Sequence, residues 1–182
     1  MKQLRITTFV AAVALVAMIN IASLAVAEDE TSKFKAKLDG YQETPQAIST
    51  PGRGRFKAEV KDNETKIEIE LTYSGLEGMP TPPNFLPLRA HIHLARPGVT
   101  GCVVIPLCGT TTPLMTPACP ASPGTVIKTL TAADVIACTT GGIAAGQLGE
   151  VIKAMHANAT YVNVHNDTYP SGEIRGAIKE ND

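Results

Sequence analysis

Two of the protein's four histidines lie two positions apart, in the sequence Ala-His-Ile-His-Leu at residues 90–94. Side chains of a β-strand alternate between its two faces, so His91 and His93 share one face while the apolar residues of the segment share the other. A third histidine, His165, follows the same alternation in Thr-Tyr-Val-Asn-Val-His at 160–165. Three neutral imidazoles on rigid strands suit copper or zinc, with a fourth position open to water. The pattern predicts a metal site if these strands are neighbours.

Further polar residues share the non-core face of the later segments, and we expect this polar face, with Glu173 and Arg175, to point outward to solvent. Asn163 lies two positions before His165, and Glu173 and Arg175 alternate with isoleucines in a final strand at 172–178. We expect these three residues to surround the ligands, with Glu173 or Asn163 accepting a hydrogen bond that fixes a histidine tautomer. A shared ion at roughly 2.1 Å from each ring would bring the ring nitrogens to within about 4 Å of one another.

His-x-His alone is a weakly specific signal, because exposed histidines are common. The alternative is that the three histidines only complete hydrogen bonds among strands. The fourth histidine, His156, lies at the edge of the apolar stripe of a predicted helix, and we expect it to be partly exposed and to have no ligand role.

Catalysis by a nucleophile has little support in the sequence. The chain contains no Gly-x-Ser-x-Gly motif and no phosphate-binding glycine loop. The cysteines are expected to be paired and so unavailable as nucleophiles. The sequence therefore favours a binding module over an enzyme.

Four cysteines, an even number, fall between residues 102 and 138. In an exported chain this pattern favours two disulfides, and three pairings are possible. We favour Cys108 with Cys119, which would close a Thr/Pro-rich loop, and Cys102 with Cys138. A zinc site made by all four thiolates is the alternative, although the paired C-x-x-C spacing of such sites is missing.

Residues 1–27 have the pattern of an export signal: basic residues first, then an apolar run, then Ala-Val-Ala as a small-x-small cleavage site. An uncleaved anchor is the alternative, since residues 6–27 are just long enough to span a bilayer of roughly 30 Å. We expect residues 28–182 to form a single domain in a secreted or periplasmic protein. Contact with a membrane is expected only if the signal is retained.

The charge balance argues against nucleic-acid binding. Removing the signal takes two of the 16 basic residues and leaves 14 against 17 acidic ones. A duplex-binding surface needs a basic patch, and none is visible. The expected partner is therefore a metal ion or an unidentified extracytoplasmic protein.

Alternating apolar and polar residues predict most of the remaining elements as half-buried strands. We expect strands at 34–38, 55–60, 66–73, 90–94, 102–107, 160–165 and 172–178. The second and third should form a hairpin around 62–64, with lysines and glutamates pairing across its wet face.

The connections contain the remaining signals. The prolines of 79–87 predict a crossing loop, and 109–124 is predicted to be an irregular surface segment. A short helical turn is expected at 132–137 and a helix at about 147–157. Because regular β-α alternation is absent, the predicted fold class is all-β: an antiparallel Greek-key sandwich or barrel with one or two short helices in connections.

Four motifs in order resemble the signatures of the CHRD domain, which is named for chordin and is widespread in exported bacterial proteins. They are Leu-Asp-Gly-Tyr-Gln-Glu-Thr-Pro at 38–45, Ala-His-Ile-His at 90–93, Tyr-Val-Asn-Val-His at 161–165 and Pro-Ser-Gly-Glu-Ile-Arg-Gly at 170–176. The resemblance runs from about residue 34 to 178 and implies a β-rich extracellular module. The cysteine-containing insertion 102–138 departs from the plainest form of that domain.

A weaker likeness is to the copper side of copper/zinc superoxide dismutase, which would make His91, His93 and His165 copper ligands. The bridging histidine and the zinc ligands of that enzyme have no counterparts, because no histidine lies between His93 and His156. Three hypotheses follow: a non-enzymatic metal-binding module, a structural or adhesive module without metal, and, more distantly, a redox enzyme. Fold analogy cannot choose among them.

Overall fold

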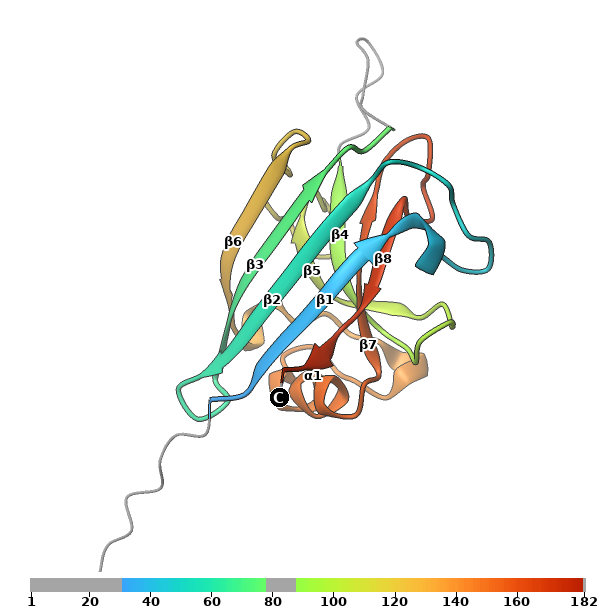
Figure 1. Ribbon diagram of the computed structural model, residues 1–182. Coiled ribbons are helices and arrows are strands. Elements are labelled where there is room, and N and C mark those ends of the chain that lie inside the picture. Colours follow the sequence, from blue (N-terminus) through green and yellow to red (C-terminus); the bar gives the residue numbers. More distant parts are fainter. Residues whose placement is uncertain (1–30, 78–87, 182) are drawn as a thin grey trace, which may run out of the picture.

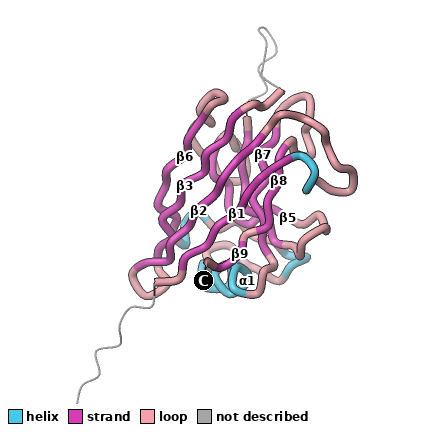
Figure 2. Tube along the Cα trace, viewed as in Figure 1, coloured by secondary structure: helices cyan, strands magenta, loops and turns pink. Residues whose placement is uncertain are grey.

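The computed structural model describes residues 31–77 and 88–181. Its strands form one antiparallel sheet that curls into a nearly closed barrel (Figures 1 and 2). The predicted antiparallel all-β fold with a short helix is confirmed. The predicted export signal and the proline-rich loop at 79–87 lie outside the described residues.

The strand bounds agree with most of the predicted segments. They are β1 (Lys33–Asp39), β2 (Arg53–Lys61), β3 (Lys66–Ser74), β4 (Arg89–Leu94), β5 (Cys102–Cys108), β6 (Gly124–Leu130), β7 (Thr160–His165), β8 (Ile174–Ala177) and β9 (Lys179–Glu180). The order along the sheet is β5-β4-β7-β8-β1-β2-β3-β6, and β9 pairs with β1. Strands β4 and β7, which carry the three candidate histidines, are therefore direct neighbours.

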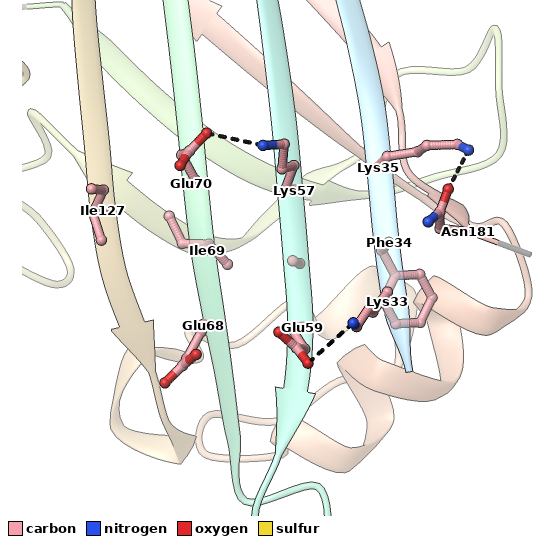
Figure 3. Close-up of a pocket in the computed structure, with 11 residues that line it drawn as sticks. Lys33, Phe34, Lys35, Lys57, Glu59, Glu68, Ile69, Glu70, Ile127 and Asn181 are labelled. Atoms are coloured by element: carbon pink, nitrogen blue, oxygen red, sulfur yellow. Dashed lines mark hydrogen bonds and ion pairs between the residues drawn. The ribbon is translucent and has the colours of Figure 1, made fainter. Parts of the chain in front are cut away.

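The hairpin of β2 and β3 forms as expected and has two different faces. Its inner side chains are buried in the core, including Phe56 and Ile67. Its outer face is charged, and Lys57 on β2 lies 3.5 Å from Glu70, its register partner on β3 (Figure 3). The predicted cross-strand pairing on the wet face is confirmed.

Strand β6 was not predicted, and its residues explain why. It pairs with β3 along its length, yet only Leu130 among its residues is buried, and Ile127 is 78% exposed. Val126 and Ile127 are adjacent, which breaks the alternation that marks a half-buried strand. Backbone pairing with β3, rather than its own apolar face, specifies this strand.

The predicted helix is confirmed as α1 (Leu148–His156), which lies at the end of the barrel near the C-terminus (Figure 1). Its apolar stripe is buried: Leu148, Val151, Ile152 and Met155. The fourth histidine, His156, ends α1 with its Nδ1 atom 3.0 Å from a carboxylate oxygen of Glu180 and is remote from the other three by sequence and element. The turn expected at 132–137 is a single 3-10 turn, Ala132–Asp134.

Both favoured disulfides are present, Cys102–Cys138 and Cys108–Cys119. No cysteine is free, so the four-thiolate zinc site is wrong. The first disulfide joins the start of β5 to the segment before α1, and the second closes the loop that follows β5. Paired cysteines fit an oxidising, extracellular location. Among the described residues, no helix combines the length and hydrophobicity that a membrane span requires.

Candidate metal centre

The pairing of β4 with β7 brings the three candidate ligands together. In the register, His91 is opposite Asn163 and His93 is opposite Tyr161, while His165 is opposite Arg89. The alternation of both strands then directs all three imidazoles to one side of the sheet. Their ring centroids are 5.0 to 5.7 Å apart.

Backbone carbonyls fix the tautomers of two of these histidines. His93 Nδ1 lies 3.0 Å from the carbonyl oxygen of Gly101, and His165 Nδ1 lies 3.2 Å from that of Pro170. Because a carbonyl can only accept, each Nδ1 must carry the proton and donate it. The Nε2 atom of each ring therefore has a free lone pair.

The remaining histidine is held through its other nitrogen. His91 Nε2 lies 2.9 Å from the hydroxyl oxygen of Thr110, which can donate or accept. When Nε2–H donates to Thr110, the Nδ1 atom of His91 has the free lone pair. Thr110 is positioned by its own backbone N–H, which donates to the Thr116 hydroxyl at 2.9 Å within the loop closed by Cys108–Cys119.

The second ring nitrogen of each of the three histidines is a possible metal ligand. His91 Nδ1, His93 Nε2 and His165 Nε2 are all buried and have no hydrogen-bond partner among the described residues. One ring nitrogen from each histidine lies within 4.8 Å of the others, so these residues form a group that could hold a metal ion. This upper limit is close to the separation of about 4 Å expected around a shared ion.

The face that carries the histidines is buried, which corrects the expectation of a solvent-facing patch. His91, His93 and His165 are only 7 to 9% exposed, and Glu173 and Arg175, expected to point outward, are 0% and 2% exposed. Loops cover this side of the sheet, as the contacts to Gly101, Thr110 and Pro170 show. The candidate centre is an internal polar cluster between sheet and loops.

Burial also sets the charge of the three rings. Desolvation lowers the pKa of His91 and of His93 to about 4 and that of His165 to about 3. The neighbouring positive charges of Arg89, near His91 and His165, and of Arg175, near His93, lower these pKa values further. All three imidazoles are thus neutral at pH 7, the state in which their nitrogens can bind a metal.

The residues predicted to surround the ligands make their described hydrogen bonds elsewhere. Asn163 donates from Nδ2 to a carboxylate oxygen of Glu43 at 3.3 Å. Glu173 accepts from Asn166 Nδ2 and, at 2.8 Å, from the backbone N–H of Glu77. The acceptors seen on the histidines are Gly101, Thr110 and Pro170, which lie in the loops after β4, β5 and β7. Strand alternation does not indicate how these loops fold back over the sheet.

Arg175 reaches the histidines through an aromatic ring. Its guanidinium carbon lies 3.5 Å from the centre of the Tyr161 ring, and that ring stacks with His93 at 4.6 Å. Arg175 also donates to the Thr44 hydroxyl and, at 2.6 Å, to the carbonyl of Val99. A cation on an aromatic face is favourable, so this stack fixes one side of the His93 ring.

Comparison with known proteins agrees with the resemblance seen in the sequence. The CHRD domain family model matches residues 34–178, which is well over half of the chain. No curated protein and no solved structure gives a significant match, and the likeness to copper/zinc superoxide dismutase gains no support from them. The four motifs, the β-rich fold and the extent of the match agree, and the chain belongs to the CHRD domain family.

Proposed function

We propose that this protein is an exported, non-enzymatic binding module that holds one copper ion through His91, His93 and His165. Two observations carry the proposal: each of the three histidines has one buried ring nitrogen without a partner among the described residues, and one ring nitrogen of each lies within 4.8 Å of the others. Leaving a buried polar atom unpaired costs free energy, commonly about 1–3 kcal/mol. Three such atoms on three neighbouring rings, whose centroids are 5.0 to 5.7 Å apart, favour a ligand that satisfies all of them.

The ligand set favours copper over other divalent ions. Imidazole nitrogen suits copper and zinc, while hard ions such as calcium prefer oxygen, and at a given site copper(II) generally binds more tightly than zinc. Three protein ligands can leave one position open for a water molecule or a small anion. Zinc is the alternative ion, and a direct comparison of the two affinities decides between them.

Export and the absence of enzymatic activity complete the proposal. Export is supported by the signal-like pattern of residues 1–27 and by two disulfides, which persist in oxidising compartments. A non-enzymatic role is supported by the lack of a nucleophile motif in the sequence. The module would act by holding the ion or by presenting it to an extracytoplasmic partner.

Metal titration tests the proposal directly. Copper and zinc are titrated into the disulfide-bonded protein in competition with a chelator of known affinity, and calorimetry gives the stoichiometry. We expect one copper ion per chain. His91→Ala, His93→Ala or His165→Ala should weaken binding by at least about 100-fold, since each removes one of three ligands.

The fourth histidine provides a matched control. His156→Ala removes an imidazole that is paired with Glu180 and is outside the site, so copper affinity should stay within about twofold. The metal site is contradicted if the wild type binds no more copper or zinc than the triple alanine variant. Lower melting temperatures in the variants without any metal effect would instead support a structural or adhesive module. A redox enzyme would require turnover above that of free copper.

A further inference from the structure

A cleft of about 490 Å³ opens beside the histidine cluster. Its polar lining residues are Arg89 and His91 of β4 and Thr110, Thr111 and Thr112 of the loop after β5. Its other lining residues are apolar residues and a glycine. No acidic side chain is among these lining residues, so the cleft combines one permanent positive charge with several hydroxyl groups.

The guanidinium of Arg89 forms no ion pair within residues 31–77 and 88–181. Its Nε atom is buried and has no hydrogen-bond partner there. The nearby His91 and His165 cannot compensate the charge of Arg89, because a histidine ring is either neutral or positive. A partly buried guanidinium without a partner is costly, and an anion would compensate it.

The hydroxyl of Thr110 is oriented to contribute as well. Its oxygen accepts from His91 Nε2–H in the tautomer that frees Nδ1, so its own hydrogen is available for another acceptor. The loop is closed by Cys108–Cys119, and the Thr116 backbone N–H donates to the Thr110 carbonyl at 2.8 Å, which holds the residue in place. Thr111 and Thr112 also line the cleft.

We propose that this cleft binds a small oxyanion, either a carboxylate or an inorganic oxyanion, through the Arg89 guanidinium and the threonine hydroxyls. The planar fork of an arginine matches the paired oxygens of such anions and can bind them with two parallel hydrogen bonds. The site goes beyond the proposed copper site and does not depend on it. The anion should bind to metal-free protein.

Nuclear magnetic resonance of the metal-free, disulfide-bonded protein tests the anion site. Sodium acetate and sodium sulfate are titrated separately against sodium chloride at constant ionic strength, and the backbone amide shifts of residues 109–112 are followed. We expect saturable shifts with acetate, with sulfate or with both, and the tighter anion identifies the carboxylate or the inorganic class. Arg89→Gln should weaken the binding at least tenfold.

An exposed arginine supplies the matched control. Arg96→Gln makes the same change of charge on the surface and should leave the dissociation constant within about twofold. The proposal is overturned if neither anion gives saturable shifts, or if Arg96→Gln weakens binding as much as Arg89→Gln does. Should Arg89→Gln fail to fold, Arg89→Lys keeps the charge but loses the fork, and an unchanged affinity in that variant would also overturn it. If the metal titration shows no copper or zinc binding, the anion titration still tests this site.

Discussion

Each histidine of the candidate centre uses one ring nitrogen to contact the protein and keeps the other free. The contacts come from Gly101, Thr110 and Pro170, which belong to three separate loops. Donation from one nitrogen fixes the tautomer and the ring orientation, as a metal-binding histidine requires. The chemistry of this site therefore depends on single atoms in loops as much as on the histidines themselves.

Another buried residue, Glu43, makes the stability depend on pH. Burial raises its pKa from 4.5 to about 7, although Arg175 and a hydrogen bond from Asn163 partly oppose the shift. The folded protein thus binds more protons than the unfolded chain between those two pH values, and its stability falls as the pH rises through this window. Glu43→Gln removes the titration and keeps an oxygen that can accept from Asn163.

We therefore expect the melting temperature of Glu43→Gln, relative to wild type, to be higher at pH 8 than at pH 5. Calorimetric melting at both pH values measures this difference. Glu64→Gln, at an exposed turn position, is the control. Its melting temperature should differ from that of wild type by the same amount at both pH values. A difference for Glu43→Gln that does not change with pH would show that the ionised carboxylate is not costly in the fold.

At the scale of elements, the apolar pattern of a segment specifies whether it packs into the core, while backbone pairing with a neighbouring strand specifies an edge strand such as β6. The hairpin β2–β3 and helix α1 were both predicted, because each carries its own apolar face or stripe. Strand β6 was missed because its inward face is weak: only Leu130 is buried, Val126 is partly buried, and the strand depends on pairing with β3. The stability contributed by α1 should then reside in its buried stripe and not in its exposed side.

A pair of substitutions one position apart on α1 tests this. Ile152 is fully buried, so Ile152→Ala should lower the free energy of unfolding by about 2–5 kcal/mol through lost burial and a cavity. Lys153 is exposed and pairs with Glu150 on the surface, so Lys153→Ala should change the free energy of unfolding by less than about 0.5 kcal/mol. Chemical denaturation measures both. Similar losses in the two variants would mean that α1 is not anchored by its stripe.

At the scale of the whole molecule, the barrel has two kinds of outer surface. The outer face of β1, β2 and β3 is solvated and carries lysines and glutamates, as Figure 3 shows. The corresponding side of β4, β7 and β8 is covered by loops and carries the histidines. Both disulfides lie in the insertion that supplies part of this cover.

Removing the disulfides one at a time should show how much each contributes to the free energy of unfolding. In the chain-entropy model a longer closed loop stabilises more, and the sequence separations are 36 for Cys102–Cys138 and 11 for Cys108–Cys119. The double serine variants should then lose about 4 and about 3 kcal/mol of unfolding free energy, respectively. Equilibrium denaturation measures both values. The reverse order would indicate that contacts of the loop, including Thr110 with His91, outweigh chain entropy.

The sequence alone determined the strands with regular alternation, the helix, the fold class and the histidines that share a face. These features are local, because a period of two or of 3.6 residues reports which side of an element is buried. The cysteine pairs were favoured from their spacing in an exported chain, and the structure confirms them. The family resemblance was visible for the same reason, since its motifs lie on these strands.

Only the tertiary structure decided what the polar face of β4 and β7 contacts. Alternation shows that His91, His93 and His165 point away from the apolar core. It does not show whether that face is exposed to solvent or covered by a loop. The covering contacts depend on how the loops after β4, β5 and β7 fold back over the sheet, and Arg89 becomes the neighbour of His165 only through strand pairing. Which ring nitrogens are free, and which charge lies next to them, are consequences of non-local packing that no local pattern encodes.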